Sequence, residues 1–151
     1  MTTQLVLELE LPADARLLPR TRKAVSGYLE DVGAEADDRA DVVLALDEAC
    51  ANVIRHAFPS GVPGTIRLRA EISHDSVTVQ VEDDGVGFDA LAATRRAPGP
   101  EDTSGRGLHM IRTLMTTVQL ESPTETGGTR LRMQKLLREK ATSNGSGRHS
   151  R

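Results

Sequence analysis

The stretch LALDEACANVIRHAF, residues Leu44–Phe58, predicts an amphipathic helix with two polar residues on one face. Glu48 and Asn52 are four residues apart, so their side chains leave a helix about 40° apart and about 6 Å apart along its axis. The apolar residues Leu46 and Val53 lie on roughly the opposite side, which is expected to pack against the rest of the protein. The helix therefore presents Glu48 and Asn52 away from its core-facing side.

A carboxylate beside an amide oxygen forms a chemically useful pair. The carbonyl oxygen of Asn52 can ligate a hard cation, and the carboxylate of Glu48 can accept a proton from a hydroxyl group. The same spacing also occurs wherever two polar residues share the solvated face of a helix. Taken alone, the pair leaves both interpretations open.

The sequence DDGVGFD, residues Asp83–Asp89, predicts a tight turn directly after a strand. Gly85 and Gly87 permit backbone angles that other residues avoid, and they let a ligand approach the main chain closely. Asp83, at the end of the strand, can accept a hydrogen bond from an exocyclic amine of such a ligand. An acidic turn without a ligand is the alternative interpretation.

The sequence SGRGLHMIRTLM, residues Ser104–Met115, predicts a third helix that begins near Gly107. Gly105 and Gly107 would leave backbone N–H groups accessible at the helix start, where the helix dipole favours anions such as phosphate. A flexible hinge before a helix is the alternative. The sequence contains no GxxxxGK[ST] motif, so a nucleotide would not be held by a P-loop.

The remaining periodicity predicts strands and helices in an order that fixes the fold class. Apolar residues alternate in the expected strands and recur at helical spacing in the expected helices. The expected elements are a strand at Leu5–Leu11, helices at Ala15–Val32 and Asp38–Phe58, and strands at Thr65–Ser73, Val77–Glu82, Val118–Glu121 and Gly128–Leu136. This order predicts an α/β two-layer sandwich, with a mixed, mostly antiparallel sheet and helices on one face.

Two segments fall outside these elements, and one helix end has a predicted cap. Ala90–Ser104 shows little periodicity and is expected to be a mobile loop. Residues 1–138 are expected to form one domain, followed by a polar, disordered tail at residues 139–151. Asp37 or Asp38 is expected to cap the helix that follows it.

Composition excludes several classes of protein. The chain has 151 residues, a formal net charge of −3 and 2% aromatic residues, a poor composition for binding nucleic acid through phosphate contacts and base stacking. No apolar run reaches the roughly 20 residues of a membrane span, and the N-terminus lacks the pattern of a signal peptide. We therefore expect a cytoplasmic protein that binds neither nucleic acid nor membrane.

Cys50, the single cysteine, is expected to be a buried apolar residue.

Together, the three segments Leu44–Phe58, Val79–Asp89 and Ser104–Met115 resemble the ATPase domain shared by gyrase, heat-shock chaperones, histidine kinases and mismatch-repair ATPases. Within that superfamily the chain is most similar to the bacterial anti-sigma factor serine kinases. The resemblance covers roughly Leu5–Leu136. Histidine kinases carry a phosphoacceptor histidine on a helical hairpin before this domain, whereas no histidine precedes Glu48 here. A stand-alone kinase for a protein substrate is therefore the expected form.

The resemblance implies a role for each residue of an ATP site. Glu48 would be the general base, Asn52 would ligate Mg²⁺, and Asp83 would recognise the adenine amino group. Thr129 would supply a second adenine contact, and Ala90–Ser104 would form a lid. The residues that would lie along the nucleotide are Gly85 and Gly87 near the base, and Gly105, Arg106, Gly107 and Leu108 near the phosphates.

The resemblance also implies a function in partner switching. The protein would bind a sigma factor, keep it from RNA polymerase, and phosphorylate a serine or threonine of an anti-anti-sigma antagonist protein; it would act as a homodimer. A basic surface on the first helix, with Arg16, Arg20, Arg22 and Lys23, is a candidate contact for these partners, or merely a solvated face. Two alternatives are an ATP-binding regulatory module without phosphoryl transfer, and a partner switch with another output.

Overall fold

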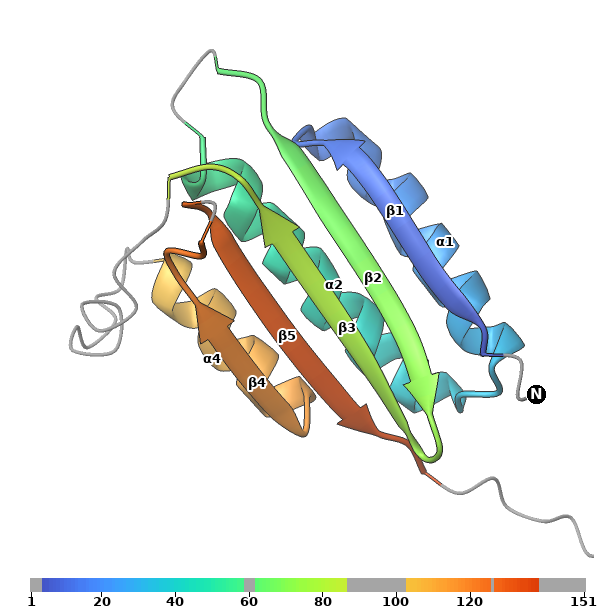
Figure 1. Cartoon of the computed structure of the whole chain (residues 1–151). Coiled ribbons are helices and arrows are strands. Elements are labelled where there is room, and N and C mark those ends of the chain that lie inside the picture. Colours follow the sequence, from blue (N-terminus) through green and yellow to red (C-terminus); the bar gives the residue numbers. More distant parts are fainter. Residues whose placement is uncertain (1–3, 59–61, 87–102, 126, 139–151) are drawn as a thin grey trace, which may run out of the picture.

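The computed structural model describes residues 4–58, 62–86, 103–125 and 127–138. The elements are β1 (Val6–Pro12), a short 3-10 helix η1 (Ala15–Leu17), α1 (Leu18–Asp31), α2 (Ala36–His56), β2 (Thr65–Ser73), β3 (Ser76–Asp83), α4 (Thr103–Leu114), β4 (Thr117–Glu121) and β5 (Thr129–Leu136). The strands form one sheet in the order β1-β2-β3-β5-β4. Figure 1 shows the helices together on one face of this sheet.

The predicted α/β sandwich with helices on one face is confirmed. One detail differs, because every pairing between the described strands is antiparallel rather than mixed. Two hydrogen-bonded neighbours, β2 and β3, are joined by a hairpin in which His74 has a φ of 52°. The registers place Asp83, at the end of β3, between Ile66 of β2 and Thr129 of β5.

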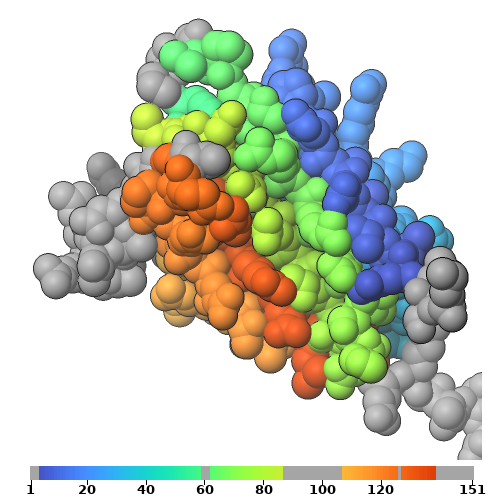
Figure 2. Space-filling model, in the orientation of Figure 1, coloured from blue at the N-terminus to red at the C-terminus, as the bar shows by residue number. Residues whose placement is uncertain are grey.

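Alternation along most of each strand separates an apolar face from a polar face. In β2, Ile66 and Leu68 are buried whereas Arg67 and Arg69 are exposed. The helix-free face of the sheet, which Figure 2 presents to the viewer, therefore carries charged side chains. The opposite face carries the hydrophobic core, which α2 covers along the middle of the sheet between α1 and α4.

Helix α2 is the centre of that core. Val42, Leu46 and Ala49 are fully or almost fully buried on the side that faces the sheet, which is the amphipathic stripe that the sequence predicts. Cys50 is buried as well, as predicted. Its burial raises the pKa of the thiol to about 12, so the thiol stays protonated at neutral pH and serves as an apolar core residue.

The N-termini of two helices differ from the predictions. The first predicted helix divides into η1 and α1, because the carboxylate of Asp14 accepts the N–H of Arg16 and closes a separate short turn. The predicted caps of α2 are wrong: Glu35 is the N-cap residue, and Asp37 and Asp38 lie inside the first turn. Carboxylates in a first turn still favour the helix through its dipole.

The start of α4 also differs. The helix begins at Thr103, before Gly107, so Gly105 and Gly107 lie inside it rather than ahead of it, and Ser104 is helical rather than part of a loop. The rest of the predicted loop and the predicted tail at 139–151 lie outside the described residues. In the described part of the chain, no helix is long and apolar enough to cross a membrane.

Candidate functional site

The C-terminal half of α2 holds the first predicted pair. Glu48 and Asn52 are both partly buried, and the side chain of Glu48 is 21% exposed. The guanidinium of Arg55 donates one hydrogen bond to Glu48 Oε1 at 3.0 Å and another to Asn52 Oδ1 at 2.7 Å. A carboxylate, an amide oxygen and a cation therefore share one stripe of the helix.

Arg55 is a residue that sequence reasoning missed. Its position was readable, because Arg55 lies three residues after Asn52 and seven after Glu48, spacings that return to the same helix face. Its hydrogen bonds to both functional groups run along one face of α2, and the structure shows that both are formed. The guanidinium balances the charge of Glu48 and fixes the direction of both oxygens.

Gly107 of α4 packs directly against this pair. A Cβ atom on Gly107 would lie 2.4 Å from Glu48 Oε1 and 3.0 Å from Asn52 Nδ2, which is closer than side-chain atoms can approach. Glycine therefore leaves room for the side chains of Glu48 and Asn52 against α4. The contact joins the third sequence segment to the first.

Gly85 joins the second segment to the same helix. A Cβ atom on Gly85 would lie 2.1 Å from the carbonyl oxygen of Ala57, the residue that ends α2. The N–H of Val86 donates to that same oxygen at 2.8 Å. From the sequence, we expected a glycine here because it lets a ligand approach the main chain. The structure shows a second reason, which is that the turn packs closely on the end of α2.

Asp83 lies at the base of the glycine turn, at the end of β3. Its side chain is buried, with 1% exposure, and Oδ1 accepts the N–H of Gly85 at 2.9 Å. Burial raises the pKa of this carboxyl group, while backbone hydrogen bonds from Gly85 and Thr129 oppose the rise. A buried carboxylate needs hydrogen-bond donors, and its oxygens can accept about four, so an amine-bearing ligand suits it.

Thr129 faces Asp83 across the β3–β5 ladder. It is 9% exposed, and its hydroxyl lies 2.9 Å from the hydroxyl of Ser122. Just before it, a Cβ atom on Gly128 would lie 1.9 Å from the carbonyl oxygen of Asp83. The backbones at the end of β3 and the start of β5 therefore lie in close contact. This pairing places Thr129 beside the buried carboxylate of Asp83.

The remaining predicted site residues are less informative. Gly87 lies outside the described residues, and Gly105 and Arg106 lie in the first turn of α4. Leu108 is half-buried and packs on the hydrophobic core. Because α4 begins at Thr103, the backbone N–H groups left free at a helix start belong to the turn beginning there, and Gly107 lies one turn further in.

The donor set fits a metal that is shared with a phosphate-bearing ligand. No cluster of three or more His, Cys, Asp or Glu residues that could hold a metal occurs in the described ranges. Asn52 and Glu48 nevertheless offer two hard oxygen donors side by side, where both residues meet Gly107. Mg²⁺ is commonly held by one or two protein oxygens, with phosphates and water completing its shell.

Comparison with known proteins agrees with this site. The family model described as "Histidine kinase-like ATPase domain" matches residues 11–135. This chain belongs to that family. It is 34% identical to the serine-protein kinase RsbW of Halalkalibacterium halodurans over 147 residues, which cover 91% of this chain and 87% of that protein. It is 31% identical to the serine-protein kinase RsbW of Bacillus cereus over 149 residues, which cover 93% and 91%. These matches confirm the resemblance to the anti-sigma serine kinases.

Solved structures agree on the fold. The RsbU and RsbW domains of a Mycobacterium tuberculosis protein match with a TM-score of 0.66 and 21% identity, over 88% of this chain and 32% of the other. This chain thus spans about a third of the mycobacterial one. A histidine kinase domain from Erythrobacter litoralis matches with a TM-score of 0.54 and 20% identity, over 84% of this chain and 62% of the other.

Proposed function

We propose that this protein is an ATP-dependent anti-sigma serine/threonine kinase that works by partner switching. One observation carries the proposal: two segments distant in the sequence, the turn after β3 and helix α4, both pack on the C-terminal end of α2. Gly107 contacts Glu48 and Asn52, and Gly85 contacts Ala57. The 31–34% identity to serine-protein kinases over about nine tenths of the chain supports the same activity.

The converging residues suggest how ATP would lie. Asp83 would accept the adenine amino group, with Thr129 and the Gly85–Gly87 turn beside the base. The phosphates would extend along α2 toward α4, bordered by Gly105, Arg106, Gly107 and Leu108. Asn52 would ligate Mg²⁺, which neutralises phosphate charge when it is bound. Residues 1–138 would form this nucleotide-binding domain.

Glu48 would act as the general base. An acceptor hydroxyl would give its proton to the carboxylate while its oxygen bonds to the γ-phosphorus and the bond to ADP breaks. Phosphoryl transfer needs mainly positioning and charge neutralisation, so the hydrogen bonds of Arg55 to Glu48 and Asn52 would contribute by orienting both groups.

The partners would be a sigma factor and an anti-anti-sigma antagonist protein. The basic surface of α1 is smaller than the sequence indicated, because Arg16 pairs with Asp14 and Arg22 pairs with Asp47. Arg20 and Lys23 are exposed and form no ion pair with another described residue. These two cations are therefore available to contact an acidic partner.

We also propose that the protein is a homodimer, on the basis of its resemblance to the anti-sigma kinases. Light scattering after size-exclusion chromatography of the full chain tests this state. A mass near 33 kDa, twice the 16.3 kDa of one chain, is expected. A monomeric mass at every concentration tried contradicts it.

The activity is tested with γ-labelled ATP, Mg²⁺ and candidate antagonist proteins encoded near this gene. Transfer to serine or threonine of one antagonist is expected. Glu48→Gln should lower single-turnover transfer by about 10²–10⁴, the usual contribution of a general base, and leave ATP affinity within about threefold. Glu10→Gln, on the exposed outer face of β1, is the control and should match the wild type. Tight ATP binding without transfer to any antagonist would instead identify a non-catalytic regulatory module.

A further inference from the structure

The outward side of α2 carries an exposed large hydrophobic residue next to the proposed base. Leu44 is 47% exposed and lies four residues before Glu48. Its side chain therefore lies about 6 Å nearer the helix N-terminus and about 40° around the axis from Glu48. Ala40, one turn earlier, is also exposed. An apolar stripe thus runs along α2 up to Glu48.

The charged groups on both sides of Leu44 are already paired. Toward α1, Arg22 Nη1 donates to Asp47 Oδ1 at 2.8 Å. Toward α4, Lys135 Nζ donates to Asp41 Oδ2 at 3.0 Å. An apolar centre with a polar rim is the usual anatomy of a protein–protein contact, so the patch suits an uncharged side chain of a partner.

The geometry of phosphoryl transfer indicates on which side of the bound nucleotide this patch would lie. Along α2 the order is Leu44, Glu48, Asn52 and then Ala57, against which the turn after Asp83 packs. A nucleotide with its base at Asp83 and its metal at Asn52 occupies the C-terminal part of this line. In-line displacement places the acceptor on the side of the γ-phosphate opposite the leaving group, and that side is toward Leu44.

We propose that Leu44 is the docking point for the acceptor protein and helps to set its specificity. The segment that carries the acceptor hydroxyl presents an apolar side chain to Leu44 while the hydroxyl reaches Glu48. The two anchor points are about 6 Å apart, which two residues of an extended segment or one turn of a helix can span. The partner is thus an antagonist protein with an apolar residue two to four positions from its acceptor serine or threonine. This inference rests on the proposed kinase function.

Kinetics of Leu44→Ala in the full-length protein test the inference. We expect the antagonist concentration that gives half-maximal single-turnover transfer to rise about tenfold or more, because an exposed leucine that becomes buried on binding contributes strongly to the affinity. The rate at saturating antagonist, the ATP affinity and the melting temperature should stay unchanged. Leu136→Ala, another exposed leucine at 55%, is the matched control and should behave as the wild type.

Binding measurements separate this inference from the kinase proposal. Antagonist affinity with a non-hydrolysable ATP analogue should fall about tenfold in Leu44→Ala, and sigma-factor affinity should not. Combining Leu44→Ala with alanine at the apolar neighbour of the acceptor serine should cost little more than either change alone. Unchanged antagonist affinity, or a loss confined to the sigma factor, overturns the inference. Wild-type protein that binds antagonist through Leu44 without phosphorylating it overturns the kinase proposal alone.

Discussion

The two faces of the sheet are built from alternate residues of the same strands, yet they hold very different interactions. On the inner face, Leu68 and Met133 are buried against the helices. On the outer face, Arg67 lies beside Glu82, and Arg130 reaches Glu82 and two further carboxylates, those of Glu121 and Glu125. The first face fixes the position of α2 and hence of the site, whereas the second is a network of ion pairs at the protein surface.

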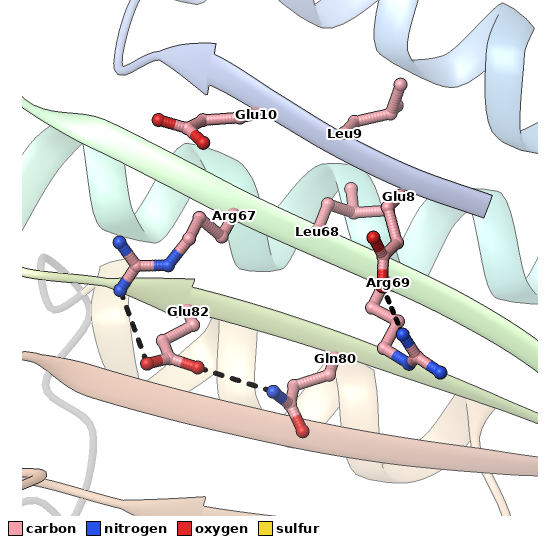
Figure 3. Close-up of a pocket in the computed structure, with 8 residues that line it drawn as sticks. All are labelled: Glu8, Leu9, Glu10, Arg67, Leu68, Arg69, Gln80 and Glu82. Carbon is pink, nitrogen blue, oxygen red and sulfur yellow. Dashed lines mark hydrogen bonds and ion pairs between the residues drawn. The ribbon is translucent and has the colours of Figure 1, made fainter. Parts of the chain in front are cut away.

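A shallow groove on the outer face illustrates the difference. Figure 3 shows that most of its polar side chains point toward one another, with Glu10 outside these pairs: Arg67 toward Glu82, Gln80 toward the same carboxylate, and Arg69 toward Glu8. In the part of the chain that the structure describes, these groups satisfy one another rather than converge on a ligand. A hollow lined by paired charges is therefore a weaker site than the compact contacts around α2.

The largest expected effect is on the inner face. Leu68→Ala should lower the free energy of unfolding by about 2–5 kcal/mol, the usual loss for a buried leucine. Leu68 is 2% exposed and lies opposite Leu9 and Val81 in the ladder. Urea denaturation followed by circular dichroism measures this change in the free energy of unfolding. A loss below 1 kcal/mol would mean that the inner face does not dominate stability.

Asp83→Asn should weaken ATP binding by about 10- to 150-fold, since a hydrogen bond to a charged group contributes about 1.5–3 kcal/mol. The variant keeps an oxygen for the Gly85 N–H but lacks the charge and one acceptor. Calorimetric titration with Mg-ATP measures this, and unchanged affinity would remove Asp83 from the adenine site.

The same variant has a pH signature. The pKa of Asp83 is raised above 3.8 by burial, so the folded state prefers the protonated carboxyl, and that preference is lost as pH rises through the folded pKa. Asparagine never ionises. The stability of Asp83→Asn relative to the wild type should therefore increase as the pH rises above 3.8 and level off once the folded carboxyl is ionised. A difference that is constant with pH would contradict the burial of a charged Asp83.

Gly107→Ala should have a smaller effect on stability, about 1 kcal/mol, because the new methyl group overlaps Glu48 Oε1, the far end of a flexible side chain, and makes that side chain move. Phosphoryl transfer should fall as Glu48 is displaced. Gly27→Ala on α1 is the matched control: nothing lies within 4 Å of its Cβ position, so it should stabilise by about 0.4–1 kcal/mol. Destabilisation of both variants to the same extent would show that the α2–α4 contact is not special.

The smallest expected effect is on the outer face. Arg130→Gln should cost about 1 kcal/mol or less, even though Arg130 pairs with three carboxylates, because Glu121 and Glu125 are exposed and ion pairs at a protein surface contribute little. The cost should shrink further as salt rises from 0.05 to about 0.5 M. A salt-independent loss above 2 kcal/mol would show that the outer face is a structural layer in its own right.

The sequence by itself determined the fold class, the order of elements and the chemistry of the candidate residues. Alternation and helical spacing are local patterns, so they predicted the strands closely, with β2 at Thr65–Ser73 as observed. They were less reliable at helix ends. Whether Asp37, Asp38 or Glu35 caps α2, and whether α4 starts at Thr103 or near Gly107, depends on competing local hydrogen bonds and tertiary contacts.

Only the tertiary structure decided which atoms meet. The packing of Gly107 on Glu48 and the packing of Gly85 on Ala57 depend on how α2, α4 and the end of β3 are placed together. The exposure of Leu44 beside the proposed base likewise depends on how far α1 and α4 cover α2. The physical reason is that periodicity fixes which face of a helix is apolar, whereas close packing between elements distant in sequence fixes what lies against the other face.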